Sequence, residues 1–147
     1  MSHDDDALTL HAGQPLVQEG LAWLERIAER DSWPAALRFQ LTLCLEEALA
    51  NVQAHGHGGA GPGDAARVRL ACRRQGRAVA LEIADNGPPF DPTAATLAPL
   101  AATLDDALPG GHGLRLMRHY LSSMSYQYQA GENRLTLISL ESLPDAD

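Results

Sequence analysis

The chain contains no lysine: all eleven of its basic residues are arginines. A P-loop needs a lysine on the β- and γ-phosphates of its nucleotide, so this class of nucleotide-binding protein is excluded. No apolar run approaches the roughly 18 residues of a membrane span, and the acidic residues 1–6 are the reverse of a secretory signal. We therefore expect a cytoplasmic protein without a membrane association.

Cysteine and positive charge are also scarce. The only two cysteines, Cys44 and Cys72, lie inside apolar patterns, which predicts buried thiols rather than a disulfide. The net charge is −8, and without a basic face we expect no direct binding to nucleic acid. Five arginines alternate with core residues on a predicted hairpin: Arg67, Arg69, Arg73, Arg74 and Arg77. Either they form a solvated strand face, or they dock an acidic partner.

The length of 147 residues fits one domain. We assign residues 1–14 to an N-terminal segment with at most one strand, around residues 7–11, and residues 15–142 to a single domain. Helical spacing predicts helices over 15–30, from Pro34 to about residue 54, and over 112–121, with Ser32 as a cap of the second.

Alternating patterns predict two hairpins. The first pairs 67–73 with 79–83, and the second pairs 125–129 with 134–140 around a turn at 130–133. This order of elements predicts an α+β fold, a two-layer sandwich with helices on one face of a mostly antiparallel sheet. Residues 88–111 form an irregular, proline-rich stretch with at most a short helix near 94–102, and a loop of this length is typical of a functional lid or of a disordered segment.

Glu47 and Asn51 are four residues apart on the second predicted helix, so their side chains lie on one face. A carboxylate accepts protons, and an amide oxygen is a hard neutral ligand suited to Mg²⁺. Taken alone, the pair is equally consistent with exposed polar residues that support a helix.

Asp85 ends a predicted strand, and Asn86-Gly87 turns the chain. A carboxylate at the mouth of a sheet accepts a hydrogen bond from an exocyclic amine such as adenine N6, and Gly87, without a Cβ, lets a flat ring approach the backbone. The alternative is a plain turn, for which these residues are well suited. Farther along, the glycine-rich residues 110–113 open a predicted helix, where exposed amides and the helix dipole favour an anion. Taken alone, these glycines are equally consistent with a flexible segment that binds nothing.

Together, these segments resemble a known set of motifs. Glu-Ala-x-x-Asn on a helix, Asp-x-Gly after a strand, and Gly-x-Gly-Leu at a helix start after a lid look like the N, G1 and G2 boxes of the gyrase/Hsp90/histidine-kinase/MutL ATPase superfamily. Within it, the chain resembles the small, single-domain anti-sigma-factor serine/threonine kinase family, over roughly residues 15–140. Phe90-Asp91-Pro92 and the closing strand at 131–137 support this resemblance.

The resemblance implies a Bergerat ATP-binding fold and a role for each motif residue. Glu47 would be the catalytic base, Asn51 the Mg²⁺ ligand, Asp85 the adenine reader and Gly87 its backbone neighbour. The G2 box would complete the ATP site, with phosphate-binding amides at Gly111 and Gly113 and the remaining positions beside the cofactor: His112 and Leu114.

The resemblance also implies partners. The acceptor would be a serine of a STAS-domain anti-anti-sigma protein, the kinase would bind a sigma factor, and a homodimer is expected. A non-catalytic nucleotide-binding switch of the same fold is the alternative, since no basic residue lies between Arg77 and Arg115 to give the lid a cation. A third interpretation, metal binding by His55 and His57, rests on an incomplete ligand set.

Overall fold

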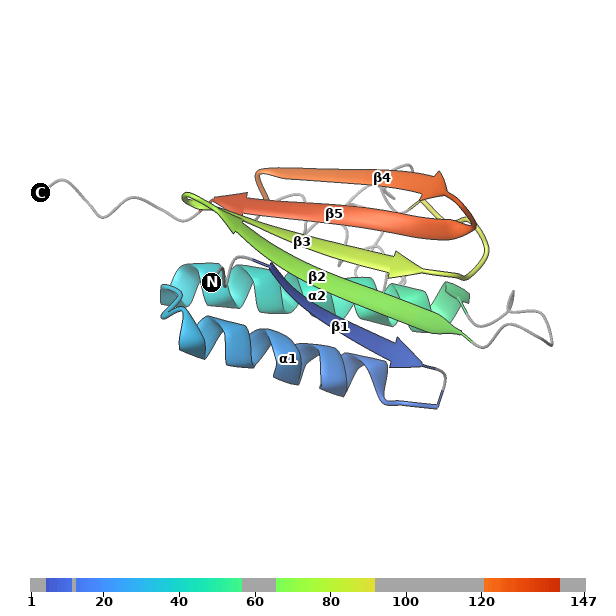
Figure 1. Cartoon of the computed structure of the whole chain (residues 1–147), viewed down its shortest axis with the longest axis horizontal. Helices are drawn as coiled ribbons and strands as arrows, with labels where there is room; N and C mark the ends of the chain where they lie inside the picture. The colour runs from blue at the N-terminus through green and yellow to red at the C-terminus, as the bar shows by residue number, and fades with distance from the viewer. Residues whose placement is uncertain (1–4, 12, 57–65, 92–120, 141–147) are drawn as a thin grey trace, which may run out of the picture.

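The computed structural model describes residues 5–11, 13–56, 66–91 and 121–140. Its elements are β1 (Asp5–His11), α1 (Leu16–Arg30), α2 (Ala35–Gly56), β2 (Arg67–Gln75), β3 (Ala78–Asp85), β4 (Ser123–Gln129) and β5 (Glu132–Leu140). The strands form one antiparallel sheet in the order β1-β2-β3-β5-β4. Both helices lie along one face of it (Figure 1). The predicted α+β two-layer sandwich is confirmed.

The core lies between the helices and the inner face of the sheet. Along β2, Val68, Leu70 and Cys72 are buried, while Arg67, Arg69 and Arg73 face outward, as the alternation predicts. The same period of two continues through β3 and β5. From α2, Leu41 and Leu45 are fully buried against these strands. Burial of such apolar side chains contributes most of the favourable free energy of folding.

The N-terminal strand is present and pairs with β2 along its whole length, so it forms one edge of the main sheet. Leu10 is fully buried, and Leu8 packs against the core. At the other end of the strand, Arg30 at the end of α1 donates two hydrogen bonds to the Asp6 carboxylate, at 2.8 and 2.9 Å. These contacts fix α1 across β1.

The connection between the helices differs from the prediction that Ser32 caps α2. Ser32 has a φ of 53° and belongs to the end of α1. Its N–H donates to Glu29 O at 3.3 Å, and the Trp33 N–H donates to Ala28 O at 3.0 Å. This pair of hydrogen bonds is a Schellman motif, which satisfies the last carbonyls of a helix. Ser32 therefore occupies the left-handed position that usually holds glycine.

The second hairpin also differs from the prediction, because its turn is two residues rather than four. Ala130 and Gly131 have φ values of 55° and 78°. Two consecutive residues with positive φ make a tight turn whose twist matches that of the flanking strands. Glu132 and Asn133, predicted to lie in the turn, are therefore the first residues of β5. In this register Asn133 pairs with Asp85.

Cys44 and Cys72 are free and buried, as predicted, and burial raises the pKa of each thiol to about 12. Within the described ranges, no helix is long and apolar enough to cross a membrane. The predicted lid beyond residue 91, the short helix at 94–102 and the helix up to residue 120 lie outside the described residues.

Candidate nucleotide site

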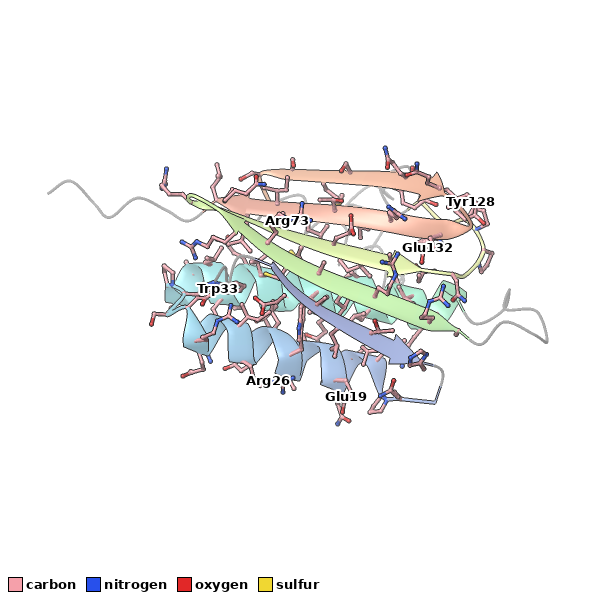
Figure 2. All side chains as sticks on the ribbon, in the orientation of Figure 1. Glu19, Arg26, Trp33, Arg73, Tyr128 and Glu132 are labelled. Carbon is pink, nitrogen blue, oxygen red and sulfur yellow. The ribbon has the colours of Figure 1, made fainter. Side chains whose placement is uncertain are left out.

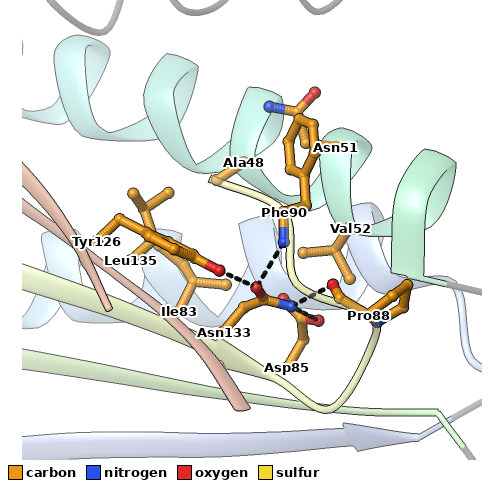
Figure 3. Close-up of a pocket in the computed structure, with 10 residues that line it drawn as sticks. All are labelled: Ala48, Asn51, Val52, Ile83, Asp85, Pro88, Phe90, Tyr126, Asn133 and Leu135. Carbon is orange, nitrogen blue, oxygen red and sulfur yellow. Dashed lines mark hydrogen bonds between the residues drawn. The ribbon is translucent and has the colours of Figure 1, made fainter. Parts of the chain in front are cut away.

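A pocket opens between the C-terminal half of α2 and the inner face of the sheet. Figure 3 shows its lining: Ala48, Asn51, Val52, Ile83, Asp85, Pro88, Phe90, Tyr126, Asn133 and Leu135. The walls are mainly apolar, and the polar atoms at its floor come from two adjacent strand ends, Asp85 on β3 and Asn133 on β5. A concave, mainly apolar site with a few fixed polar groups is typical of small-molecule binding.

Asp85 ends β3, where the chain turns away from the sheet, and only 9% of its surface is exposed. Its Oδ1 accepts hydrogen bonds from the Gly87 N–H at 2.9 Å and from Asn133 Nδ2 at 3.1 Å. Because all of its hydrogen bonds within the described chain converge on Oδ1, Oδ2 remains as an acceptor for a ligand. Burial raises the pKa of Asp85, and the two hydrogen bonds oppose that shift.

Gly87 is held at the rim of the pocket by its own backbone. Its N–H donates to Asp85, and its carbonyl accepts a hydrogen bond from Asn133 Nδ2 at 3.3 Å. A second hollow, of about 320 Å³, adjoins the pocket, and Gly87, Asp85 and Val52 contribute to its lining. The Asp85–Gly87 turn is thus part of a larger concave region.

Asn133 is a residue of the pocket that was not among the predicted site residues. It is 6% exposed, and its amide joins the turn after β3 to the two C-terminal strands. Nδ2 also donates to Pro88 O at 2.8 Å, while Oδ1 accepts from the Phe90 N–H at 2.9 Å and from the Tyr126 hydroxyl. An inward-facing polar residue in register with Asp85 would have indicated this role. The prediction of a turn at 130–133 placed Asn133 outside the strand instead.

This amide also fixes the beginning of the predicted lid. Because it bonds both Pro88 O and the Phe90 N–H, residues 88–90 are held against β5 before the chain leaves the described region. Phe90 and Tyr126 add aromatic surface to the pocket wall. Burial raises the pKa of the Tyr126 hydroxyl. The aromatic walls suit a flat ring, since aromatic pairs favour stacked or edge-to-face contacts.

Asn51 and Glu47 lie one turn apart on α2. Asn51 lines the pocket on the helix side, across from Asp85 (Figure 3). Glu47 is partly buried next to the pocket, although it is not among the residues that line it. Burial raises the pKa of Glu47, and the neighbouring charge of Glu46 adds to this shift. The structure therefore brings Asn51 and Asp85 to one pocket and places Glu47 beside it.

Among the described residues, no group of three metal-ligating His, Cys, Asp or Glu side chains occurs. Mg²⁺ commonly takes one or two protein oxygens and completes its shell with phosphates and water, so the neutral Asn51 amide fits this role. Of the proposed histidine pair, His57 lies outside the described residues. Four predicted ATP-site residues also lie outside them: Gly111, His112, Gly113 and Leu114.

Comparison with known proteins identifies the family of the chain. The family profile of the histidine kinase-like ATPase domain matches residues 12–139. The curated serine/threonine-protein kinase BtrW of Bordetella bronchiseptica is 51% identical over 139 residues, which cover 95% of this chain and 96% of that protein.

Two solved structures share the fold. The catalytic domain of histidine kinase ThkA matches with a TM-score of 0.52 at 9% identity, over 95% of this chain and 99% of that one. The Acinetobacter baumannii histidine kinase AdeS matches with a TM-score of 0.50 at 14% identity, over 94% and 68% of the two chains. At these identities the two structures establish the fold alone. The chain therefore belongs to the histidine kinase-like ATPase domain family, among its serine/threonine-protein kinases, as the three motifs predicted.

Proposed function

We propose that this protein is an ATP-dependent protein-serine kinase that phosphorylates a STAS-type anti-anti-sigma protein and also acts as an anti-sigma factor. One observation carries the nucleotide assignment: the buried Asp85–Asn133 pair forms the polar floor of an apolar pocket and leaves one carboxylate oxygen for a ligand. The family membership supplies the kinase class.

The pocket suits an adenine ring. Asp85 Oδ2 would accept a hydrogen bond from the exocyclic amine, while Ile83 and Leu135 offer apolar contacts to the ring. A single hydrogen bond to a charged acceptor contributes about 1.5–3 kcal/mol. Guanine carries a carbonyl oxygen at C6 where adenine carries its amine, so in the same orientation that oxygen would face Asp85 Oδ2 and leave two acceptors without a donor. The proposed site therefore discriminates in favour of ATP over GTP.

The phosphoryl transfer itself would use α2. The acceptor serine oxygen attacks the γ-phosphorus, the bond to the bridging oxygen breaks, ADP leaves, and Glu47 takes the hydroxyl proton. A raised pKa suits this role, because a general base is most effective when its pKa lies near the working pH. Mg²⁺ held by Asn51 would neutralise charge on the phosphates, and such reactions depend mainly on positioning and charge.

The wider setting that we propose is a partner-switching system in the cytoplasm. The kinase, as a homodimer, would hold either a sigma factor or the STAS-domain protein, and phosphorylation of the second would decide which one is bound. The 51% identity to a protein named as a serine/threonine-protein kinase supports the enzyme class. The choice of partners follows from the resemblance to the anti-sigma-factor kinase family.

The test is phosphate transfer from radiolabelled ATP to a purified STAS-domain protein from the same partner-switching system. Glu47→Ala should lower the rate by roughly 10²–10⁴-fold, the usual contribution of a general base. Glu46→Ala is the matched control, because Glu46 is the exposed neighbour on the same helix, and it should retain transfer. If Glu47→Ala transferred phosphate at the wild-type rate, the proposed base would be wrong.

One observation favours a second function, a nucleotide-binding switch without catalysis. The sequence has no basic residue between Arg77 and Arg115, so the predicted lid over 88–111 offers no cation to the γ-phosphate. This protein would then bind ATP and a partner without transferring phosphate. Nucleotide-dependent partner binding with no phosphoserine in the partner, checked by mass spectrometry, is the result that this second function predicts.

A further inference from the structure

Three arginines gather around one carboxylate on the outer face of the sheet, the face turned away from α1 and α2. Arg69 Nη2 lies 2.5 Å from Glu132 Oε1, and Arg134 Nη2 lies 3.3 Å from the same oxygen. Arg67 Nη2 lies 3.8 Å from Glu132 Oε2. Figure 2 shows Glu132 on this face. We refer to these four residues as the arginine cluster.

The arginine cluster carries a net positive charge, although the protein as a whole is negatively charged. Three guanidinium groups face a single carboxylate, whereas the whole chain has a net charge of −8. The Glu132 side chain is 11% exposed, but those of Arg67, Arg69 and Arg134 are 44%, 45% and 35% exposed. The carboxylate is therefore enclosed while the positive charge remains accessible. Such a patch attracts a negatively charged partner.

Strand register explains why the arginines meet. Arg69 on β2 and Arg134 on β5 both pair with Ala84 on the strand between them. Ala84 is only 2% exposed although it lies on the outer face, as expected if the long arginine stems cover it. Asp85 follows Ala84 on β3, and Asn133 precedes Arg134 on β5, so the two residues are neighbours one position away from the arginines. The arginine cluster thus lies directly behind the floor of the nucleotide pocket.

We propose that the arginine cluster docks an acidic segment of a protein partner in an extended conformation. Arg67 and Arg69 lie on the same face of β2, two residues apart, which is roughly 6.6–6.8 Å along a strand. Carboxylates at alternate positions of an extended segment have the same spacing. Nucleic acid is the less suitable occupant, because its binding requires many phosphate contacts along a basic surface and the chain is acidic overall.

The proposal goes beyond the kinase function and does not depend on it, because the test uses the full chain without nucleotide. The probe is a fluorescein-labelled peptide of alternating glutamate and serine, titrated at low salt and followed by fluorescence anisotropy. The double variant Arg67→Gln/Arg69→Gln should weaken binding roughly three- to tenfold, as expected for the loss of two exposed ion pairs. Added salt should weaken wild-type binding as well.

Two controls make the test specific. Arg26→Gln removes one charge from the exposed surface of α1, far from the arginine cluster (Figure 2), and should leave the affinity unchanged. Arg67 has the longest contact to Glu132, so Arg67→Gln alone should fold even if the double variant does not, and it should weaken binding about twofold.

Three results would overturn the proposal. The first is an equal loss of affinity in Arg26→Gln, which would mean that overall charge decides binding. The second is equal wild-type binding to a peptide of alternating glutamine and serine. The third is displacement of the acidic peptide by unlabelled duplex DNA at a lower concentration than by the unlabelled acidic peptide, which would assign the surface to nucleic acid.

Discussion

Replacing Asn133 tests whether the floor of the pocket holds this part of the fold together. The amide bonds five partners, but water can replace it at exposed Pro88 and at partly exposed Phe90 and Tyr126. The two buried partners, the Asp85 carboxylate and the Gly87 carbonyl, would lose a donor with no water to replace it. Each such loss costs about 1–3 kcal/mol. Asn133→Ala should therefore lower the free energy of unfolding by roughly 2–5 kcal/mol.

Urea unfolding followed by the fluorescence of the buried Trp23 and Trp33 measures this change. Asn133→Leu has nearly the same shape without the polar atoms, so it separates lost hydrogen bonds from an empty cavity, and it should be destabilised as well. Gln127→Ala, an exposed change on β4, should alter stability by less than about 0.5 kcal/mol. A loss below about 1 kcal/mol in Asn133→Ala would refute the reasoning.

Three further predictions concern other parts of the chain. Ser32→Gly should stabilise the protein by about 1 kcal/mol in urea unfolding, because glycine adopts the positive φ of this position without strain; equal or lower stability would contradict the Schellman assignment. Burial raises the pKa of Glu47, so the folded state binds its proton more tightly than the unfolded state does. The wild type should then lose stability relative to Glu47→Gln as the pH rises from the ordinary pKa of a glutamate through the raised one. Melting temperatures that show no such relative loss between about pH 4 and about pH 7.5 would contradict this. Cys44 and Cys72 should react with a thiol reagent only after unfolding, because both are buried and their pKa values are near 12; immediate reaction of the native protein would be inconsistent with the packing.

The fold could be predicted because its signals are local and periodic. The alternation of buried and exposed residues on β2 requires only that one face be covered, and the apolar stripes of the two helices supply that cover. Motif order then predicted that Asn51 and Asp85 would meet, and both line one pocket. The position of Glu47 just outside that lining is a matter of side-chain geometry, which spacing along a helix does not determine.

The missed residue shows where sequence patterns are insufficient. Gly131, Glu132 and Asn133 have turn composition, and a four-residue turn was the simpler assignment. The pairing of β3 with β5 requires the shorter turn, because a shift of one residue in β5 would send every inward side chain to the other face of the sheet. With the tight turn, Asn133 faces Asp85 and Glu132 faces the arginines. The position at which β5 begins therefore determines both the floor of the pocket and the arginine cluster.

Calorimetric titration with ATP and Mg²⁺ measures whether the pocket beside Asp85 binds the adenine of ATP. The wild type should bind ATP, and Asp85→Ala should weaken binding by at least about tenfold, the equivalent of one lost charged hydrogen bond. Glu19→Ala is the matched control, since Glu19 is an exposed carboxylate on α1 and is not among the residues that line the pocket. Equal ATP affinity in the wild type and in Asp85→Ala would contradict the assignment of this pocket.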